Sequence, residues 1–497
     1  MNTTDLLGLS PLIIPALAGI LVMLAGAFRA RPAALHALTI GGIGLALLSI
    51  PLVRSLAPRD LTPLLRLDAY ALLFLSLLYA TLGILAILAR PYLRARQREG
   101  EAFPALLLFA GAGMGVMACS NHFASFFLGL ETLTVALYVL LGYLRDDRRS
   151  LEAAVKYLIL AALASGFLLF GIALVYAATG TLVLDAAARA AAALLQEGPA
   201  AEASWAVAGM LMLMVGFGFK LALVPFHMWS PDVYQGAPAP VTALIATGSK
   251  GAVVAVLLRV LAPDIAGAGR LAPLLAGLAI VTMFAGNLLA LLQTDVKRLL
   301  AYSSIAHIGY VFVALAAGGA DGGRAVVFYM LIYLATTLGA FGIVSVLSAE
   351  GGADADDLGA YRGLGRRRPA LAATMTVMLL SLAGIPPTGG FLAKFAILDA
   401  AIGAGRWPLA LAMVLASGIG LYYYLRVLVV MYMGDEQDAP PLPSDEEGAP
   451  TLLSPAASPL GSTLALAVLV VAVLAIGLYP EPWLRAASAA VSALGGG

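Results

Sequence analysis

The chain has 497 residues, of which 61% are hydrophobic and 11% are charged, and its formal net charge is +1. Soluble domains contain about 25% charged residues, so the composition excludes a water-facing globular protein and gives no sign of a nucleic-acid partner. The single cysteine, Cys119, excludes a disulfide framework, and iron–sulfur or covalent haem sites lack their usual cysteine ligands.

Apolar runs of about 20 residues recur along nearly the whole chain, as expected of membrane-spanning helices. The first run has no Lys or Arg before it and is too long for the core of a signal peptide, so we expect a membrane helix there. The runs predict an all-α polytopic membrane protein with about 14 transmembrane helices rather than an outer-membrane barrel. The expected spans are residues 8–28, 34–53, 69–89, 103–118, 122–143, 153–178, 205–230, 238–262, 271–292, 299–319, 325–348, 370–403, 407–433 and 462–480.

The basic residues between these spans predict the orientation of the chain. Lys and Arg are enriched in cytoplasmic loops. One set of alternate loops holds 15 of them, whereas the other set, which includes the two ends and Arg259, holds nine. We therefore expect both ends on the periplasmic side. Two polar linkers separate late spans, at 349–369 and at the acidic, Pro-rich run 435–450, which we expect to be flexible.

Glycines alternate in the sequence GAGMG at residues 111–115. No strand or phosphate-facing loop surrounds it, so a nucleotide-binding fingerprint is not indicated. Small residues let membrane helices approach closely, and we expect close helix packing here.

Basic residues change type where the chain enters the membrane. The chain has 24 Arg and five Lys, yet four of the five basic residues within the spans are lysine. Arginine stays charged, whereas a buried lysine readily shifts its pKa and can exchange a proton near neutral pH. A charge at mid-membrane costs about 2.5–3.5 kcal/mol, so each needs a counter-charge, water or neutralisation. The five residues are Lys156, Lys220, Lys250, Lys394 and Arg426.

Glu131 is the one carboxylate near the middle of a span. We expect it to pair with Lys220, and the further lysines predict a proton path through the bilayer. Lys250 lies about twelve residues into its span, too deep to reach the surface easily, whereas Lys156 lies near the start of its span and has the alternative of reaching the cytoplasmic surface. A purely structural buried pair is the competing interpretation for Glu131 and Lys220.

The remaining basic positions carry simpler alternatives. Lys394 precedes Asp399 by five residues, so a local pair competes with a role in proton transfer. Arg426 lies near the cytoplasmic end of its span, where anchoring is as good an explanation as function. We expect Lys297 to be an interfacial anchor.

Two spans contain helix breakers beside a lysine. Pro225 follows Lys220, and Pro386, Pro387 and two glycines precede Lys394. Proline removes a backbone donor and clashes with the preceding turn, so we expect both helices to be broken. Broken helices in corresponding parts of two halves point to a transporter built from repeats, in which spans four to eight would match spans nine to thirteen.

Two histidines are suited to relay protons, because the pKa of histidine is near neutral. His227 follows Pro225 closely, and His307 lies among Ser303, Ser304 and neighbouring tyrosines that can hold water. A satisfied interior hydrogen bond is the alternative for each histidine.

Several of these segments together resemble the subunit N family of bacterial NADH–quinone oxidoreductase, respiratory complex I. The resemblance extends over nearly all of the chain from about residue 65. The segments that carry it are AAVKYLILAALASGFLLFGIALVYAATGTL (153–182), FHMWSPDVYQGAPAPVTALIATGSKGA (226–252), LLALLQTDVKRLLAYSSIAHIGYVFVAL (288–315), LSLAGIPPTGGFLAKF (380–395) and YYYLR (422–426).

The resemblance implies an antiporter-like fold of 14 helices with two inverted five-helix repeats and two broken helices. It divides the chain into a three-helix segment (1–100), a first repeat (101–265), a second repeat (266–434) and an acidic loop with a C-terminal helix (435–497). The functional residues of the family correspond here to Glu131, Lys156, Lys220, Lys250, His307 and Lys394.

The resemblance also implies a proton-translocating subunit of the bacterial inner membrane that binds no cofactor itself. NADH, FMN, iron–sulfur clusters and quinone would bind to partner subunits, and the other membrane-arm subunits, including the sister antiporter-like ones, would be its neighbours. Three alternatives remain open: a subunit of a cation/proton antiporter or membrane-bound hydrogenase, a chain that reduces quinone itself, and a scaffold whose lysines only pair between helices.

Overall fold

The computed structural model describes residues 2–261, 271–351, 354–433 and 460–495. Within these ranges 13 helices are long and apolar enough to cross a membrane. A fourteenth crossing consists of two shorter helices, α18 (Pro369–Ala383) and α19 (Gly389–Gly403). The expectation of an all-α membrane protein with about 14 crossings is therefore confirmed. The acidic run at 435–450 lies outside the described residues.

The unbroken crossings follow the predicted apolar runs within a few residues. They are α2 (Ser10–Ala27), α3 (Pro32–Val53), α4 (Ala69–Ala95), α5 (Ala102–Cys119), α6 (Phe123–Leu141), α7 (Arg148–Thr179), α14 (Leu271–Leu291), α15 (Val296–Ala317), α16 (Gly319–Gly351), α20 (Trp407–Met433) and α21 (Leu460–Leu478).

Two crossings in the first half depart from a regular helix. α9 (Ala200–Leu221) stops short of Pro225 and is followed by the short helix α10 (Trp229–Gly236). The next crossing is made by α11 (Ala239–Leu244), a π-helical turn (Ile245–Ser249) and α12 (Lys250–Val260).

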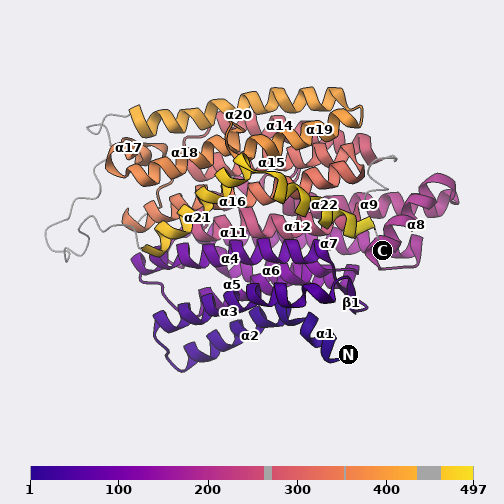
Figure 1. The fold of residues 1–497 in the computed structure, drawn as a ribbon, viewed down its shortest axis with the longest axis horizontal. Helices are drawn as coiled ribbons and strands as arrows, with labels where there is room; N and C mark the ends of the chain where they lie inside the picture. Colours follow the sequence, from indigo (N-terminus) through magenta and orange to yellow (C-terminus); the bar gives the residue numbers. More distant parts are fainter. Residues whose placement is uncertain (1, 262–270, 352–353, 434–459, 496–497) are drawn as a thin grey trace.

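The helices form one elongated bundle. Figure 1 shows α2 and α3 along one edge and α20 along the other, with α16 between them. The two ends of the chain lie at the same end of the bundle, as an even number of crossings requires. The crossings at 239–260, 296–317 and 319–349 are almost completely buried, so they form the centre of the molecule.

Some short elements outside the crossings are not apparent in the sequence. A two-stranded hairpin pairs β1 (Arg59–Thr62) with β2 (Leu65–Leu67). These strands are too short for an alternating pattern to stand out. The helices α1 (Thr3–Gly8), α8 (Leu184–Glu197), α17 (Leu364–Arg367) and α22 (Glu481–Gly495) are also too short to span a membrane.

Glycines allow three helix pairs to approach within backbone contact. A Cβ atom on Gly113 of α5 would lie 2.6 Å from the carbonyl oxygen of Gly129 in α6. A Cβ on Gly171 of α7 would lie 2.7 Å from the Leu213 nitrogen of α9, and one on Gly286 of α14 would meet α15 at 2.6 Å. The expected close packing at residues 111–115 is therefore present, and the same device recurs in two later pairs.

A buried ion pair joins the start of α4 to the end of α12. Asp68 caps α4 by accepting the Ala71 N–H at 2.7 Å, and both of its oxygens accept bonds from Arg259 at 2.9 Å. Arg259 also donates to the Ala118 carbonyl of α5. The assignment of Arg259 to a loop was therefore wrong, because its guanidinium is held inside the protein by Asp68.

We predict that Gly113→Ala destabilises the subunit by about 1–3 kcal/mol, because the added methyl group overpacks the α5–α6 contact. Heating the purified complex and following its loss of integrity measures this effect. Gly166→Ala is the matched control, because a Cβ there meets no atom within 4 Å and alanine favours the helix by about 1 kcal/mol. Equal stability of Gly113→Ala and the wild type would contradict the packing argument.

Candidate functional site

The break beside Lys220 begins with a left-handed residue. Ala222 has a φ of +59° and caps α9. The Leu223 N–H donates to the Gly218 carbonyl, which closes the helix end in the manner of a Schellman motif. Pro225 follows within the interruption, so the helix ends before the proline rather than at it.

The break beside Lys394 has the same backbone pattern. Gly384 has a φ of +84° and caps α18, and the Ile385 N–H donates to the Leu380 carbonyl. A Cβ atom on Gly384 would lie 2.8 Å from Cδ of Lys394, so this glycine is needed both for its backbone angle and for the lysine beside it. Both expected breaks are confirmed.

Lys220 lies in the last turn of α9 and is buried. Its Nζ donates to the Thr134 hydroxyl at 2.7 Å and lies 5.5 Å from the centre of the Tyr157 ring. The Glu131 carboxylate instead accepts a hydrogen bond from Ser165 at 2.6 Å. Among the described residues no ion pair joins Glu131 to Lys220, so the expected pairing is not a direct contact. The two are linked through α6, where Glu131 and Thr134 lie one turn apart.

Lys250 follows directly after the π-helical turn and is fully buried. Its Nζ donates to the Ser304 hydroxyl at 2.6 Å. Ser304 also shares a hydrogen bond of 2.6 Å with Tyr333, whose hydroxyl donates to the Ala246 carbonyl within the π-turn. The π-turn therefore offers a backbone acceptor to the same network that holds the lysine.

His307 lies between two tyrosines. Its Nδ1 is 2.7 Å from the Tyr329 hydroxyl and its Nε2 is 3.1 Å from the Tyr424 hydroxyl. The hydroxyl of Ser303 is also within hydrogen-bonding distance of Tyr424. Both nitrogens of the imidazole thus have a hydroxyl partner that can donate or accept.

Lys394 is held at the second break by neutral groups. Its Nζ donates to the Ala383 carbonyl at 2.9 Å and to the Ser417 hydroxyl at 2.7 Å, and it lies 5.0 Å from the Tyr310 ring centre. A cavity of about 10 Å³ is lined by both His307 and Lys394, which is near the lower limit for one water molecule.

The lysines near the ends of the crossings have carboxylate partners instead. Lys156 lies 2.7 Å from Glu152 and 2.9 Å from Asp232, and its side chain is 41% exposed. Lys297 lies 2.6 Å from Asp354, and its side chain is only 1% exposed. Lys297 lies at the end of its crossing, as an interfacial anchor would, but the loop after α16 covers its ammonium group rather than leaving it exposed at the interface.

The supporting residues divide into two groups. Arg426 donates to the carbonyls of Leu291 and Gln293, so it caps the end of α14 rather than joining the lysines. His227 lies at the first break, and its Nδ1 is buried without a partner in the described chain. Ser230 and Tyr234 nearby also have buried hydroxyls that no described protein group satisfies. Buried polar atoms of this kind are ordinarily satisfied by bound water.

Several tyrosines in the network were not identified from the sequence. Tyr234 neighbours Ser304 and Tyr157, so it lies between the surroundings of Lys250 and Lys220. Tyr329 and Tyr333 occupy one face of α16, one turn apart. An aromatic residue in an apolar span resembles an ordinary core residue, and only its position beside a titratable group reveals a polar role.

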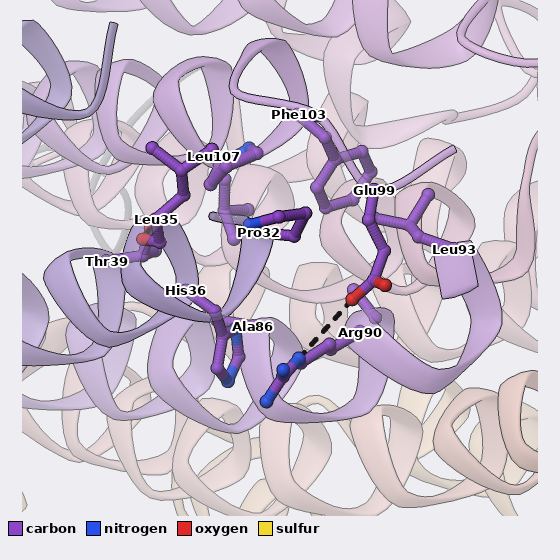
Figure 2. Close-up of a pocket in the computed structure, with 13 residues that line it drawn as sticks. Pro32, Leu35, His36, Thr39, Ala86, Arg90, Leu93, Glu99, Phe103 and Leu107 are labelled. Carbon is purple, nitrogen blue, oxygen red and sulfur yellow. Dashed lines mark hydrogen bonds and ion pairs between the residues drawn. The ribbon is translucent and has the colours of Figure 1, made fainter. Parts of the chain in front are cut away.

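Another pocket lies apart from this network. Figure 2 shows it between α3, α4 and α5, with His36 on one wall and Arg90 facing Glu99 at 3.4 Å. Its volume is about 40 Å³, and the lysines of the network do not line it. Within the described residues no group of three or more His, Cys, Asp or Glu could hold a metal ion.

Comparison with known proteins places this arrangement in a family. Residues 120–420 match the family described as NADH:quinone oxidoreductase/Mrp antiporter, transmembrane. NADH-quinone oxidoreductase subunit N from Ectopseudomonas mendocina is 43% identical, over 97% of this chain and 95% of that protein. The same subunit from Chromohalobacter salexigens is 44% identical, over 97% and 99%. A chain of respiratory complex I from Thermus thermophilus is 34% identical with a TM-score of 0.79, over 96% of this chain and 99% of that one.

The cluster around Lys297 gives a prediction for pH. Burial raises the pKa of Asp356 to about 6, while Lys297 at 3.3 Å opposes the shift. Because the folded chain binds this proton more tightly than the unfolded chain, the contribution of Asp356 to stability is largest at low pH and is lost as pH rises to about 6. Between pH 7.5 and pH 5 the wild type should gain about 1 kcal/mol relative to Asp356→Asn.

Melting temperatures of the two purified complexes, measured at both pH values, check this expectation. The comparison within the pair removes the pH effects of all other groups. A constant difference between the wild type and Asp356→Asn would contradict it.

Proposed function

The chain belongs to the NADH-quinone oxidoreductase subunit N family, and we propose that its buried lysines and histidine carry protons across the membrane while partner subunits transfer electrons. One observation carries the proposal: Lys220, Lys250 and Lys394 are buried and donate only to hydroxyls or carbonyls. The lysines near the membrane surfaces pair with carboxylates instead.

The partners of the interior lysines suit groups that change their charge. A hydroxyl accepts a hydrogen bond from an ammonium group and can donate one to a neutral amine. Thr134, Ser304 and Ser417 can therefore satisfy either form of their lysine. A carboxylate would favour the charged form alone. The arrangement thus favours proton exchange over permanent ion pairing.

The first step would couple Glu131 to Lys220. Glu131 accepts a hydrogen bond from the Ser165 hydroxyl of α7, and Lys220 donates one to the Thr134 hydroxyl of α6. A change in the charge of Glu131 would act on Lys220 through space and through the α6 backbone rather than by breaking a direct contact. Movement of α7, which carries both Ser165 and Lys156, would shift Glu131 and so change its distance from Lys220.

The central step would pass a proton from Lys220 to Lys250. Tyr157 lies beside Lys220, and Tyr234 lies near both Tyr157 and Ser304. The Ser304 hydroxyl accepts a hydrogen bond from Nζ of Lys250. The unsatisfied hydroxyls of Ser230 and Tyr234 provide sites where water would complete the route.

The last buried step would run from Lys250 to Lys394 by way of His307. Ser304 and Tyr333 connect Lys250 to the face of α16 that also carries Tyr329, which bonds to His307. The cavity lined by both His307 and Lys394 would admit a water molecule between them. Hydroxyls from different helices thus line the route from Lys250 to His307, and the cavity would carry it on to Lys394.

We further infer that NADH, FMN, iron–sulfur clusters and quinone bind to partner subunits of the complex rather than to this chain. The polar cluster at Lys297 and the positive-inside distribution of Lys and Arg support proton uptake from the cytoplasmic side of a bacterial inner membrane. Both chain ends would then face the periplasm.

We predict that Lys250→Met lowers proton pumping by the assembled complex to below a tenth of the wild type, because a positioned proton-transfer group contributes about 10²–10⁴-fold. The measurement is dye-reported acidification of inverted membrane vesicles driven by NADH. NADH oxidation by a soluble acceptor should stay unchanged, because it needs only the partner subunits.

Lys250→Arg separates proton exchange from simple charge pairing. Arginine keeps the positive charge but does not release its proton, so pumping should stay low in this variant too. A scaffold would tolerate arginine. Normal pumping in both Lys220→Met and Lys250→Met would rule out the relay.

A further inference from the structure

A second cavity lies on the side of the second break that faces the chain ends. Its volume is about 470 Å³, far larger than the cavity beside His307. It is bounded by the first turns of α16, by the later part of α19 and by the start of α22. Figure 1 shows that α22 continues from the last crossing toward the end of the bundle where both termini lie.

The two cavities follow each other along the seam between α16 and α19. Tyr329 and Ala393 line the small cavity, whereas Phe328 and Ala396 line the large one. Ala393 and Ala396 are separated by less than one helical turn, which rises 5.4 Å. The two cavities therefore border the same stretch of α19, since Leu392 and Phe395 of the large cavity lie on either side of Lys394 in the sequence.

Apolar side chains line the part of the large cavity nearest the small one. Phe328 is 1% exposed and lies against the large cavity, and Leu392 of α19 faces the same space. Neither side chain can carry a proton. Transfer between the cavities therefore requires water to enter between these side chains, and the α16–α19 seam is the place where it would do so.

The charges around the large cavity leave one carboxylate without a partner. Arg324 is paired with Asp321 at 2.9 Å, and Arg485 with Glu481 at 2.7 Å. Asp399 lines the cavity, is exposed and makes no hydrogen bond or ion pair with another described residue. The local pair of Asp399 with Lys394 that the sequence left open is absent, because Lys394 bonds to Ala383 and Ser417 instead.

We propose that this cavity is the vestibule through which protons leave the chain, and that Asp399 is the last protein group to hold them. This rests on the proposed function, because it supplies the step after Lys394. The ammonium group of Lys394 would lose a proton to water in the seam, and the carboxylate of Asp399 would gain it. Asp399 would then release the proton to water in the vestibule and return to its charged form.

Water access to the cavity can be tested without measuring pumping. We expect Ala396→Cys in the assembled complex to react with a membrane-impermeant thiol reagent added on the periplasmic side. Ala401→Cys on the same helix is the control, because Ala401 lies nearer the helix end but is fully buried. The natural Cys119 is also buried and should stay unmodified. Labelling of this chain is read by mass spectrometry, and an unreactive Ala396→Cys would overturn the vestibule.

The role of Asp399 is tested by pumping per assembled complex. Asp399→Asn should slow pumping several-fold and Asp399→Glu should restore it, because glutamate keeps the titratable group. Asp185→Asn is the control, because Asp185 is paired with Arg189 on α8, outside the vestibule. Unchanged pumping in Asp399→Asn would overturn its role. Failure of the relay itself would appear separately, as normal pumping in both Lys220→Met and Lys250→Met.

Discussion

The interior amines lie where the membrane provides no water and the described chain provides no carboxylate contact. This constraint accounts for most of the unusual local structure. Hydroxyl groups on other helices supply partners for Lys220, Lys250 and Lys394. Buried charges ordinarily require pairing, so neutral partners at three successive positions set these lysines apart from the carboxylate-paired lysines near the ends of the crossings.

The two broken helices meet the same constraint by different routes. Lys220 lies in the last turn of α9, where backbone carbonyls lack helical partners. Lys394 belongs to the helix after its break, yet it donates to Ala383, the last residue of α18. Both amines therefore lie at the carbonyl end of a half-helix, where the partial negative charge favours a cation. The opposite order of lysine and proline in the two segments thus gives the same electrostatic result.

The sequence was sufficient for the crossings and the breaks, because both depend on local signals. Apolar length identifies a span, and Pro225 and Pro387 interrupt one. Lys250 was predicted from its depth in the span, and His307 from the near-neutral pKa of histidine and its hydroxyl-bearing neighbours. Local sequence signals could not predict partners that lie far apart in the chain, such as Ser417 for Lys394 or Asp354 for Lys297. Ser and Thr on membrane helices commonly bond to their own backbone, so the sequence does not distinguish those that also receive an amine.

The ion pair between Asp68 and Arg259 has a consequence for how the chain is made. Its partners are 191 residues apart, so α4 emerges from the ribosome and meets the bilayer long before α12 has been translated. Until then Asp68 has to stay within reach of water at the membrane surface, where its role as a helix cap holds it. Docking of α12 then draws the carboxylate inside. This contact between α4 and α12 can therefore form only after the eighth crossing, the one that carries Lys250, has been inserted.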